Sequence, residues 1–342
     1  MPVRRSRAEQ LELIPRGGGA PVVLFFETRE PGELTTQDIF QVSPDGAYLA
    51  YSSHGALHVR AKDGSERTIP EYSRWGRMRF SPDGAYLAAI VGDPKGGATD
   101  RDQRVVLMEL ATGTTRELGA FTVARQLEWM RDAVVVQEWD HAHSHDVLTE
   151  LPIAPGAVAT VQLDPGAATI DKFVAAGTGT RIVAFVGDAT GYHVVSLDAD
   201  VAGAPKDLGV YSDYITNAAA SLDGERIAFT TSSAVFVTDG DARPHVISER
   251  GFVRSLWFAR DGRLGYASDK SATIVGPSGA HRFESNAPIS MLRFDPTSQR
   301  ALVATPSRAW DIAPNKPVQL DVAESGILGV DSFAGGLVVW SS

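Results

Sequence analysis

The chain has 342 residues, of which 43% are apolar, 22% are charged and none is cysteine, and its formal net charge is −10 at pH 7. The lack of cysteine excludes disulfide bonds, thiolate catalysis and zinc–thiolate sites. Nucleic-acid binding is also excluded, because neutralising phosphates requires clustered Lys and Arg, and this acidic sequence has no basic tail or stripe.

Residues 1–9 predict a flexible N-terminal tail. The first residues are basic, but they are not followed by the apolar stretch that a secretory signal needs. No window approaches the roughly 18 apolar residues of a membrane-spanning helix. We therefore expect a chain without a membrane span, located in the cytoplasm.

Residues 10–27 predict two strands, LELIP and PVVLFF, and units of four short strands follow. The four-stranded units span residues 38–70, 77–118, 124–163, 170–208, 216–248, 253–284 and 290–322. Residues 326–342 supply two more strands without a third or fourth. Because the N-terminal pair lacks a first and second strand, we expect the two chain ends to pair in one shared sheet. The count is then eight units, or seven if the ends do not pair.

An Asp-Gly turn joins the first two strands of several units. The segment FSPDGAYLAAI at 80–90 recurs as VSPDGAYLAY at 42–51 and ASLDGERIAFT at 220–230, with divergent copies at 258–267 and 294–305. Gly takes positive φ at little cost, and Asp caps such a turn through nearby backbone N–H groups. The apolar run after the turn predicts a strand buried on both faces.

These patterns predict an all-β fold: a single β-propeller domain over residues 1–342, built from four-stranded antiparallel blades and closed into a ring by the paired chain ends. The SPDG sequences at 43–46 and 81–84, followed by an apolar strand and a later turn such as KDGS, resemble the WD40-like (PD40) repeat of TolB-like propellers. This resemblance implies a propeller. Family members are binding platforms, accessory domains beside peptidases and, occasionally, lyases.

Loops between second and third strands share one face of a propeller with the loops that lead from blade to blade, and loops carry most function. Aromatic and Arg side chains anchor protein interfaces. The candidates of this kind are Arg74, Trp75, Arg77, Arg125, Tyr211, Tyr214, Phe252 and Arg254. The alternative is that the rings only fill gaps between blades and that the Arg side chains only pair with surface carboxylates.

One local cluster has metal-ligand chemistry. His141, His143 and His145 alternate in the loop EWDHAHSHD, beside Asp140. On an extended strand this spacing places the three rings on one side, and imidazoles with a carboxylate suit zinc, manganese or iron. A solvent-exposed polar loop is the alternative.

Two functions therefore stay open. The first is a non-catalytic scaffold that needs no cofactor and binds a protein partner, with a basic or mixed patch, through the loop-rich face. The second is a metal-dependent hydrolase or lyase that uses the His141–His145 loop and a divalent metal.

Overall fold

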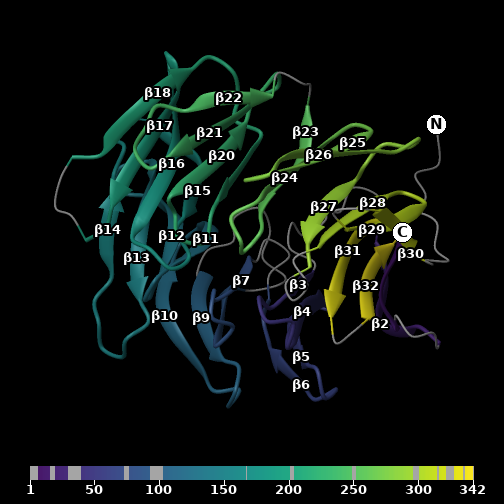
Figure 1. The fold of residues 1–342 in the computed structure, drawn as a ribbon. Coiled ribbons are helices and arrows are strands. Elements are labelled where there is room, and N and C mark those ends of the chain that lie inside the picture. Colours follow the sequence, from purple (N-terminus) through teal and green to yellow (C-terminus); the bar gives the residue numbers. More distant parts are fainter. Residues whose placement is uncertain are drawn as a thin grey trace, which may run out of the picture. The chain divides into compact units, whose positions relative to one another are not determined.

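In the computed structural model, all regular structure of the described residues is β (Figure 1). The structure describes residues 7–15, 20–29, 40–72, 77–92, 103–166, 168–200, 204–248, 252–295, 300–313, 316–320, 327–333 and 336–341. Within these ranges 32 strands form eight four-stranded antiparallel sheets. None of the described segments is a helix with the length and apolar character needed to cross a bilayer.

The chain divides into two compact units, which we call unit 1 (residues 1–68 and 254–342) and unit 2 (residues 69–253). In unit 2 the first two sheets contain β7 (Met78–Phe80), β8 (Tyr86–Val91), β9 (Gln103–Glu109) and β10 (Thr115–Phe121), then β11 (Ala124–Met130), β12 (Ala133–Asp140), β13 (His145–Pro152) and β14 (Thr160–Leu163). The next two contain β15 (Thr169–Ala175), β16 (Arg181–Asp188), β17 (Gly191–Asp198) and β18 (Lys206–Tyr211), then β19 (Asn217–Ala220), β20 (Arg226–Thr230), β21 (Val235–Asp239) and β22 (His245–Ser248).

Unit 1 also holds four sheets. Three of them contain β3 (Phe40–Val42), β4 (Tyr48–Ser53), β5 (Ala56–Ala61) and β6 (Glu66–Ile69); β23 (Val253–Phe258), β24 (Leu264–Ser268), β25 (Ser271–Gly276) and β26 (Gly279–Glu284); and β27 (Met291–Phe294), β28 (Ala301–Thr305), β29 (Arg308–Ala313) and β30 (Lys316–Leu320). The fourth has the order β2-β1-β32-β31 and consists of β1 (Arg7–Pro15), β2 (Val22–Arg29), β31 (Ile327–Phe333) and β32 (Gly336–Ser341).

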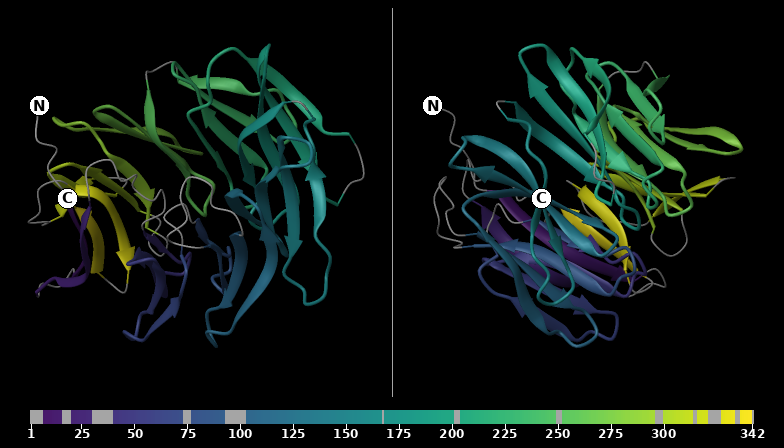
Figure 2. Two further views of the ribbon diagram at one scale, coloured as in Figure 1. Left: turned by 180° about the vertical axis from the view of Figure 1, so that it is seen from behind. Right: turned by 90° about the vertical axis from the view of Figure 1, so that its left-hand side faces the viewer.

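The predicted pairing of the chain ends is confirmed in this fourth sheet. Strand β1 runs antiparallel to β32, with Leu11 opposite Trp340 and Leu13 opposite Val338. In Figures 1 and 2 the yellow C-terminal strands accordingly lie beside the purple N-terminal ones. One detail differs from the prediction: β1 begins at Arg7, so the predicted tail of residues 1–9 loses its last three residues to the strand.

The Asp-Gly turns have the expected capping. Asp45 Oδ1 accepts a hydrogen bond from Ser43 Oγ at 2.6 Å and from the N–H of Ala47 at 3.0 Å. The Ser43 hydroxyl in turn accepts the N–H of Tyr48 at 2.8 Å, and Gly46 has φ of 69°. The same arrangement recurs at Asp83 and Asp223. These aspartates are therefore parts of the scaffold, because their side chains complete the turns.

The apolar core lies between neighbouring sheets. The strands that follow the turns are buried on both faces, as predicted: only the first residue of β4 and of β8 is partly exposed. In unit 2, for example, Phe185 of β16 packs against Phe229 of β20, with ring centroids 5.4 Å apart. Because the strand faces are buried in this packing, the loops at the two ends of the strands are the places where a ligand or partner can bind.

Candidate functional site

The two ends of the strands in unit 2 differ in what they connect. The turn end carries the turns that join the first strand of each sheet to the second and the third strand to the fourth. The connection end carries the loops between second and third strands and the segments that lead from sheet to sheet. Of the predicted partner-binding residues, Arg77, Arg125, Tyr211, Tyr214 and Phe252 lie at the connection end of unit 2. Arg254 is exposed in unit 1, and Arg74 and Trp75 lie outside the described residues.

Arg125 is held at the connection end by three contacts. Its guanidinium lies 5.1 Å from the centre of the Trp139 ring, and its Nη1 is 3.0 Å from Asp146 Oδ2. Its carbonyl oxygen accepts a hydrogen bond from Arg77 Nε at 3.3 Å. Asp146 is buried, which raises the pKa of its carboxyl, and Arg125 opposes that shift. The Arg125 side chain is nevertheless 48% exposed, so it is positioned and still open to solvent.

Tyr214 is the second positioned side chain and is 51% exposed. The edge of its ring meets Tyr192 with centroids 5.5 Å apart, and Lys172 Nζ lies 5.6 Å from its centre. The Tyr214 hydroxyl also interacts with the nearby carboxylate of Asp171. Burial lowers the pKa of Lys172, and burial together with the nearby Asp171 raises the pKa of Tyr214.

The two remaining aromatic candidates behave in opposite ways. Tyr211 packs between sheets, with its ring centroid 5.1 Å from that of Phe229 and 5.0 Å from that of Phe236. It therefore matches the alternative in which a ring fills a gap between blades. Phe252 is 56% exposed, on the segment that leads out of the last sheet of unit 2.

The histidine run does not lie on one extended strand. His141 and His143 are in the hairpin turn between β12 and β13, in which Ser144 has φ of 59°, and His145 is the first residue of β13. His143 Nδ1 is 2.8 Å from Asp140 Oδ2, an interaction that raises the pKa of the exposed His143. His145 is buried, with Nε2 2.7 Å from Asp164 Oδ1. His141 meets the Trp139 ring edge-on.

The geometry assumed for the predicted metal site, three rings on one side of a strand, is therefore wrong. Two of the rings face different carboxylates. Among the described residues, no group of three or more His, Asp and Glu side chains is arranged to hold a metal ion.

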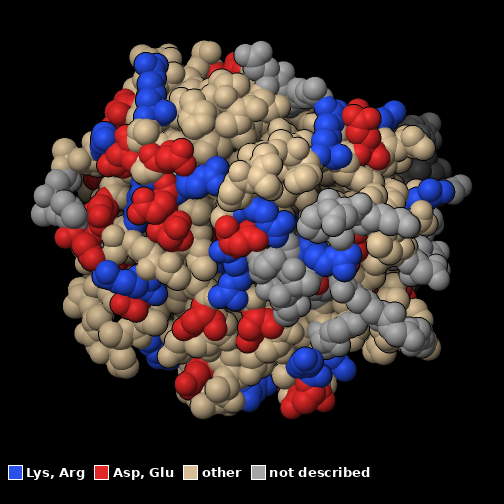
Figure 3. All heavy atoms as spheres, viewed as in Figure 1, with Lys and Arg blue, Asp and Glu red and all other residues tan. Residues whose placement is uncertain are grey.

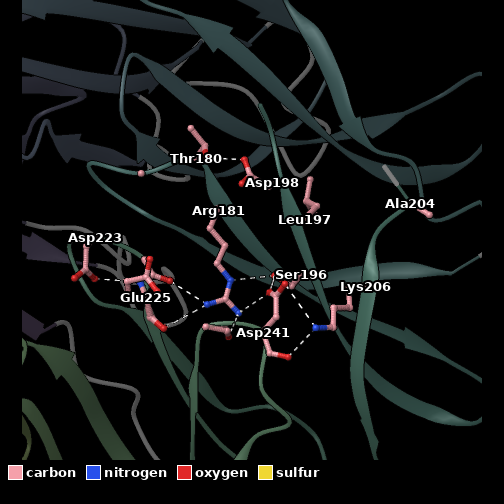
Figure 4. Close-up of a pocket in the computed structure, with 13 residues that line it drawn as sticks. Thr180, Arg181, Ser196, Leu197, Asp198, Ala204, Lys206, Asp223, Glu225 and Asp241 are labelled. Atoms are coloured by element: carbon pink, nitrogen blue, oxygen red, sulfur yellow. Dashed lines mark hydrogen bonds and ion pairs between the residues drawn. The ribbon is translucent and has the colours of Figure 1, made fainter. Parts of the chain in front are cut away.

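A cavity of about 460 Å³ lies at the turn end, between the sheet β15–β18 and the sheet β19–β22 (Figure 4). Its polar lining includes Arg181, Lys206, Asp198, Glu225 and Asp241. Lys206 Nζ donates to the carbonyl oxygen of Asp241 at 3.0 Å, across the gap between the two sheets.

Arg181 forms the joint between these sheets. Its Nε donates to Ser196 Oγ at 3.0 Å, its Nη1 to the carbonyl oxygens of Gly224 at 3.1 Å and Glu225 at 3.5 Å, and its Nη2 to the carbonyl oxygen of Gly240, with Asp241 Oδ1 at 3.4 Å. Every guanidinium nitrogen thus has an acceptor. Burial lowers the pKa of Arg181, and Asp241 and Glu225 oppose that shift. The cavity is therefore the polar seam between these two sheets. Arg181 uses its hydrogen-bonding groups to join the sheets.

Sequence reasoning missed Trp139, Lys172 and Arg181. Trp139 lies next to the histidine run, and nothing in the sequence indicated that its ring contacts Arg125. Lys172 lies within β15 and Arg181 begins β16, and the backbone oxygens that accept their hydrogen bonds belong to the segment of the next sheet. On the face drawn in Figure 3, the coloured basic and acidic side chains are interspersed, without one broad basic area among them.

The comparisons with known proteins bear on the fold. No family model matches the sequence, and no curated protein matches it. Among solved structures, the Dos1 propeller has a TM-score of 0.60 at 12% identity, over 86% of this chain and 89% of that one. The β-propeller domain of the Trilobed protease from Pyrococcus furiosus has a TM-score of 0.58 at 14% identity, over 84% and 98%. The chain is a β-propeller.

A putative TolB from Agrobacterium tumefaciens is also similar, with a TM-score of 0.48 and 16% identity over 72% of this chain and 90% of that one. The described sheets, together with the Dos1 and Trilobed protease propellers, confirm the fold implied by the SPDG repeats, and those sheets supply eight blades rather than seven. At these sequence identities the similarity establishes a shared fold, and the activities of the other propellers cannot be transferred to this chain.

Proposed function

We propose that this propeller is a scaffold that binds a protein partner through the connection end of unit 2. The observation that carries the proposal is Tyr214, a half-exposed ring fixed by Tyr192, Lys172 and Asp171. An exposed aromatic side chain that is already immobilised loses little conformational entropy when a partner covers it. Tyr, Trp and Arg also dominate the binding energy of measured interfaces.

Arg125 supports the same proposal. Its stacking on Trp139 and its contact with the buried Asp146 fix the guanidinium plane, while about half of the side chain faces solvent. A fixed guanidinium offers hydrogen bonds to carboxylates or carbonyl oxygens of a partner. Phe252 adds apolar area at the same end of the strands.

The test is affinity capture with purified tagged protein, followed by quantitative mass spectrometry. Wild type is compared with Tyr214→Ala, Arg125→Ala and the control Val246→Ala, which removes an exposed side chain from the fourth strand β22. We expect one partner that wild type and the control retain and that both test variants lose. The recovered partner is then produced and its dissociation constant measured against each variant.

Retention of every captured protein by Tyr214→Ala and Arg125→Ala, at wild-type levels, contradicts the proposal. Loss on all three variants also contradicts it, because the effect is then not specific to the connection end.

A further inference from the structure

Four neighbouring sheets of unit 1 bring side chains from their first strands together around one arginine. Arg293 of β27 has its guanidinium carbon 4.7 Å from the ring centre of Trp257 (β23) and 5.8 Å from that of Phe40 (β3). Its Nη1 is 3.6 Å from Asp331 Oδ2 (β31). The Arg293 side chain is only 19% exposed, whereas Trp257 is 39% exposed.

The N–H groups of Arg293 make no hydrogen bond with the described part of the chain. Its Nε is buried without an acceptor, and the 3.6 Å separation from Asp331 is longer than a hydrogen bond. A guanidinium carries five N–H donors, and nearly all buried polar groups in proteins are paired. Arg293 is therefore an enclosed cation whose plane is fixed by ring contacts and whose Nε finds no hydrogen-bond acceptor among the described residues.

Arg263 shows that the ring contact alone does not produce this state. Its guanidinium carbon lies 5.6 Å from the ring centre of Phe294, in the same unit, yet its Nε is 2.8 Å from Asp261 Oδ2. Arg263 thus combines a cation–π contact with a carboxylate partner at hydrogen-bond distance. It is the matched control for Arg293.

We propose that Arg293 is the anchor of a binding site for a carboxylate or phosphate group. Oxygen pairs of these anions match the fork of the guanidinium, and the aromatic walls strengthen the charge interaction by excluding water. The exposed ring of Trp257 supplies apolar contact for the carbon atoms that carry the anion. Asp331 lies 3.6 Å from Nη1, and its own charge limits how many negative charges the site accepts.

The site is in unit 1 and does not depend on the partner-binding proposal for unit 2. Two sources offer the same chemistry: a free small anion, or the terminal carboxylate of a polypeptide. The experiment therefore uses sodium phosphate, sodium acetate, a tripeptide with a free carboxylate and the same tripeptide as its amide, all at constant ionic strength with chloride as the balancing ion.

Binding is measured by calorimetric titration of the full chain and by the Nε–Hε resonance of Arg293 in a ¹⁵N spectrum. We expect saturable binding of at least one anion and a shift of this resonance. Arg293→Lys keeps the charge but loses the fork, so the affinity should fall roughly tenfold or more, while Arg263→Gln binds like wild type. Asp331→Asn should bind the anion more tightly, because a competing carboxylate is removed.

Tighter binding of phosphate or acetate than of the peptide assigns a small-anion site, and binding of the peptide but not its amide assigns a polypeptide terminus. Absence of saturable binding of every probe to wild type overturns the proposal, as does equal binding to Arg293→Lys. If the substitutions prevent folding, an Arg293 Nε–Hε resonance in wild type that no probe moves also overturns it.

Discussion

The two ends of the strands in unit 2 use polar side chains in opposite ways. At the turn end each nitrogen of Arg181 has an acceptor, four of them on the neighbouring sheet. At the connection end Arg125 and Tyr214 are fixed by their neighbours but stay about half exposed. A polar group with all its partners inside the chain stabilises the fold, whereas one that is fixed and still open has contacts left for a partner. We therefore assign stability to the turn end and recognition to the connection end.

The largest effect is expected from Arg181→Met, which keeps much of the side-chain volume and removes the guanidinium. Three backbone carbonyl oxygens and Ser196 then lose their donor in a mostly buried seam. Breaking such a bonded, buried charge costs about 3 kcal/mol or more of unfolding free energy. Chemical denaturation measures it. An unchanged midpoint would remove the distinction between the two ends.

Gly224→Ala tests the same seam through the backbone. Gly224 has φ of 77°, and a Cβ at this position would collide with Ala176 of the preceding sheet. Strain at a positive φ costs of order 1–3 kcal/mol, and the collision adds to it. Thermal unfolding should show the loss. The control is Gly262→Ala, where φ is 81° but no atom lies within 4 Å of the added Cβ, so only the backbone strain remains.

Trp139→Ala sharpens the comparison at the other end. The ring beneath Arg125 is lost, but the contact with Asp146 stays. If prior fixing of the guanidinium contributes to binding, partner affinity should fall by about 1 kcal/mol, the usual strength of an exposed cation–π contact. Surface plasmon resonance with the captured partner measures this. If Trp139→Ala binds the partner with wild-type affinity while Arg125→Ala does not, the stacking of Arg125 on Trp139 contributes nothing to binding.

Local features of the fold were predictable from the sequence, because their causes lie within a few residues. Asp45 caps a turn formed by residues 43–48, and the missing strands at each chain end revealed the shared sheet. The role of Arg181 was not predictable, since its carbonyl partners lie 43 to 59 residues further along the chain. The arrangement of the histidine rings was not predictable for a related reason: the alternation suits a strand, but the pairing of Asp140 with His145 puts the residues between them in a turn.

The smallest predicted effect concerns His193 of β17. Its Nδ1 is 2.9 Å from Asp207 Oδ2 and its Nε2 is 3.1 Å from Asp188 Oδ2. The hydrogen bond to Asp207, aided by the charge of Asp188, raises the pKa of His193 and lowers that of Asp207. The stabilisation by the protonated imidazole is therefore complete below the unfolded-state pKa of about 6.5 and is lost as the pH rises through the higher folded-state value.

His193→Gln should accordingly lower the unfolding free energy at pH 5.5–6 and have less effect at pH 8.5. Because the pair is near solvent, the difference should stay below about 1 kcal/mol. Denaturant titrations at several pH values measure it. A difference that grows with pH would contradict the assigned protonation.

The most direct measurement of the division between the two ends applies two readouts to two variants. The unfolding free energy and the dissociation constant for the captured partner are determined for Tyr214→Ala and Arg181→Met under conditions where both are folded. The account predicts a crossed result: Tyr214→Ala weakens binding and keeps its stability, while Arg181→Met loses stability and binds with wild-type affinity. A parallel loss of both quantities in both variants would contradict it.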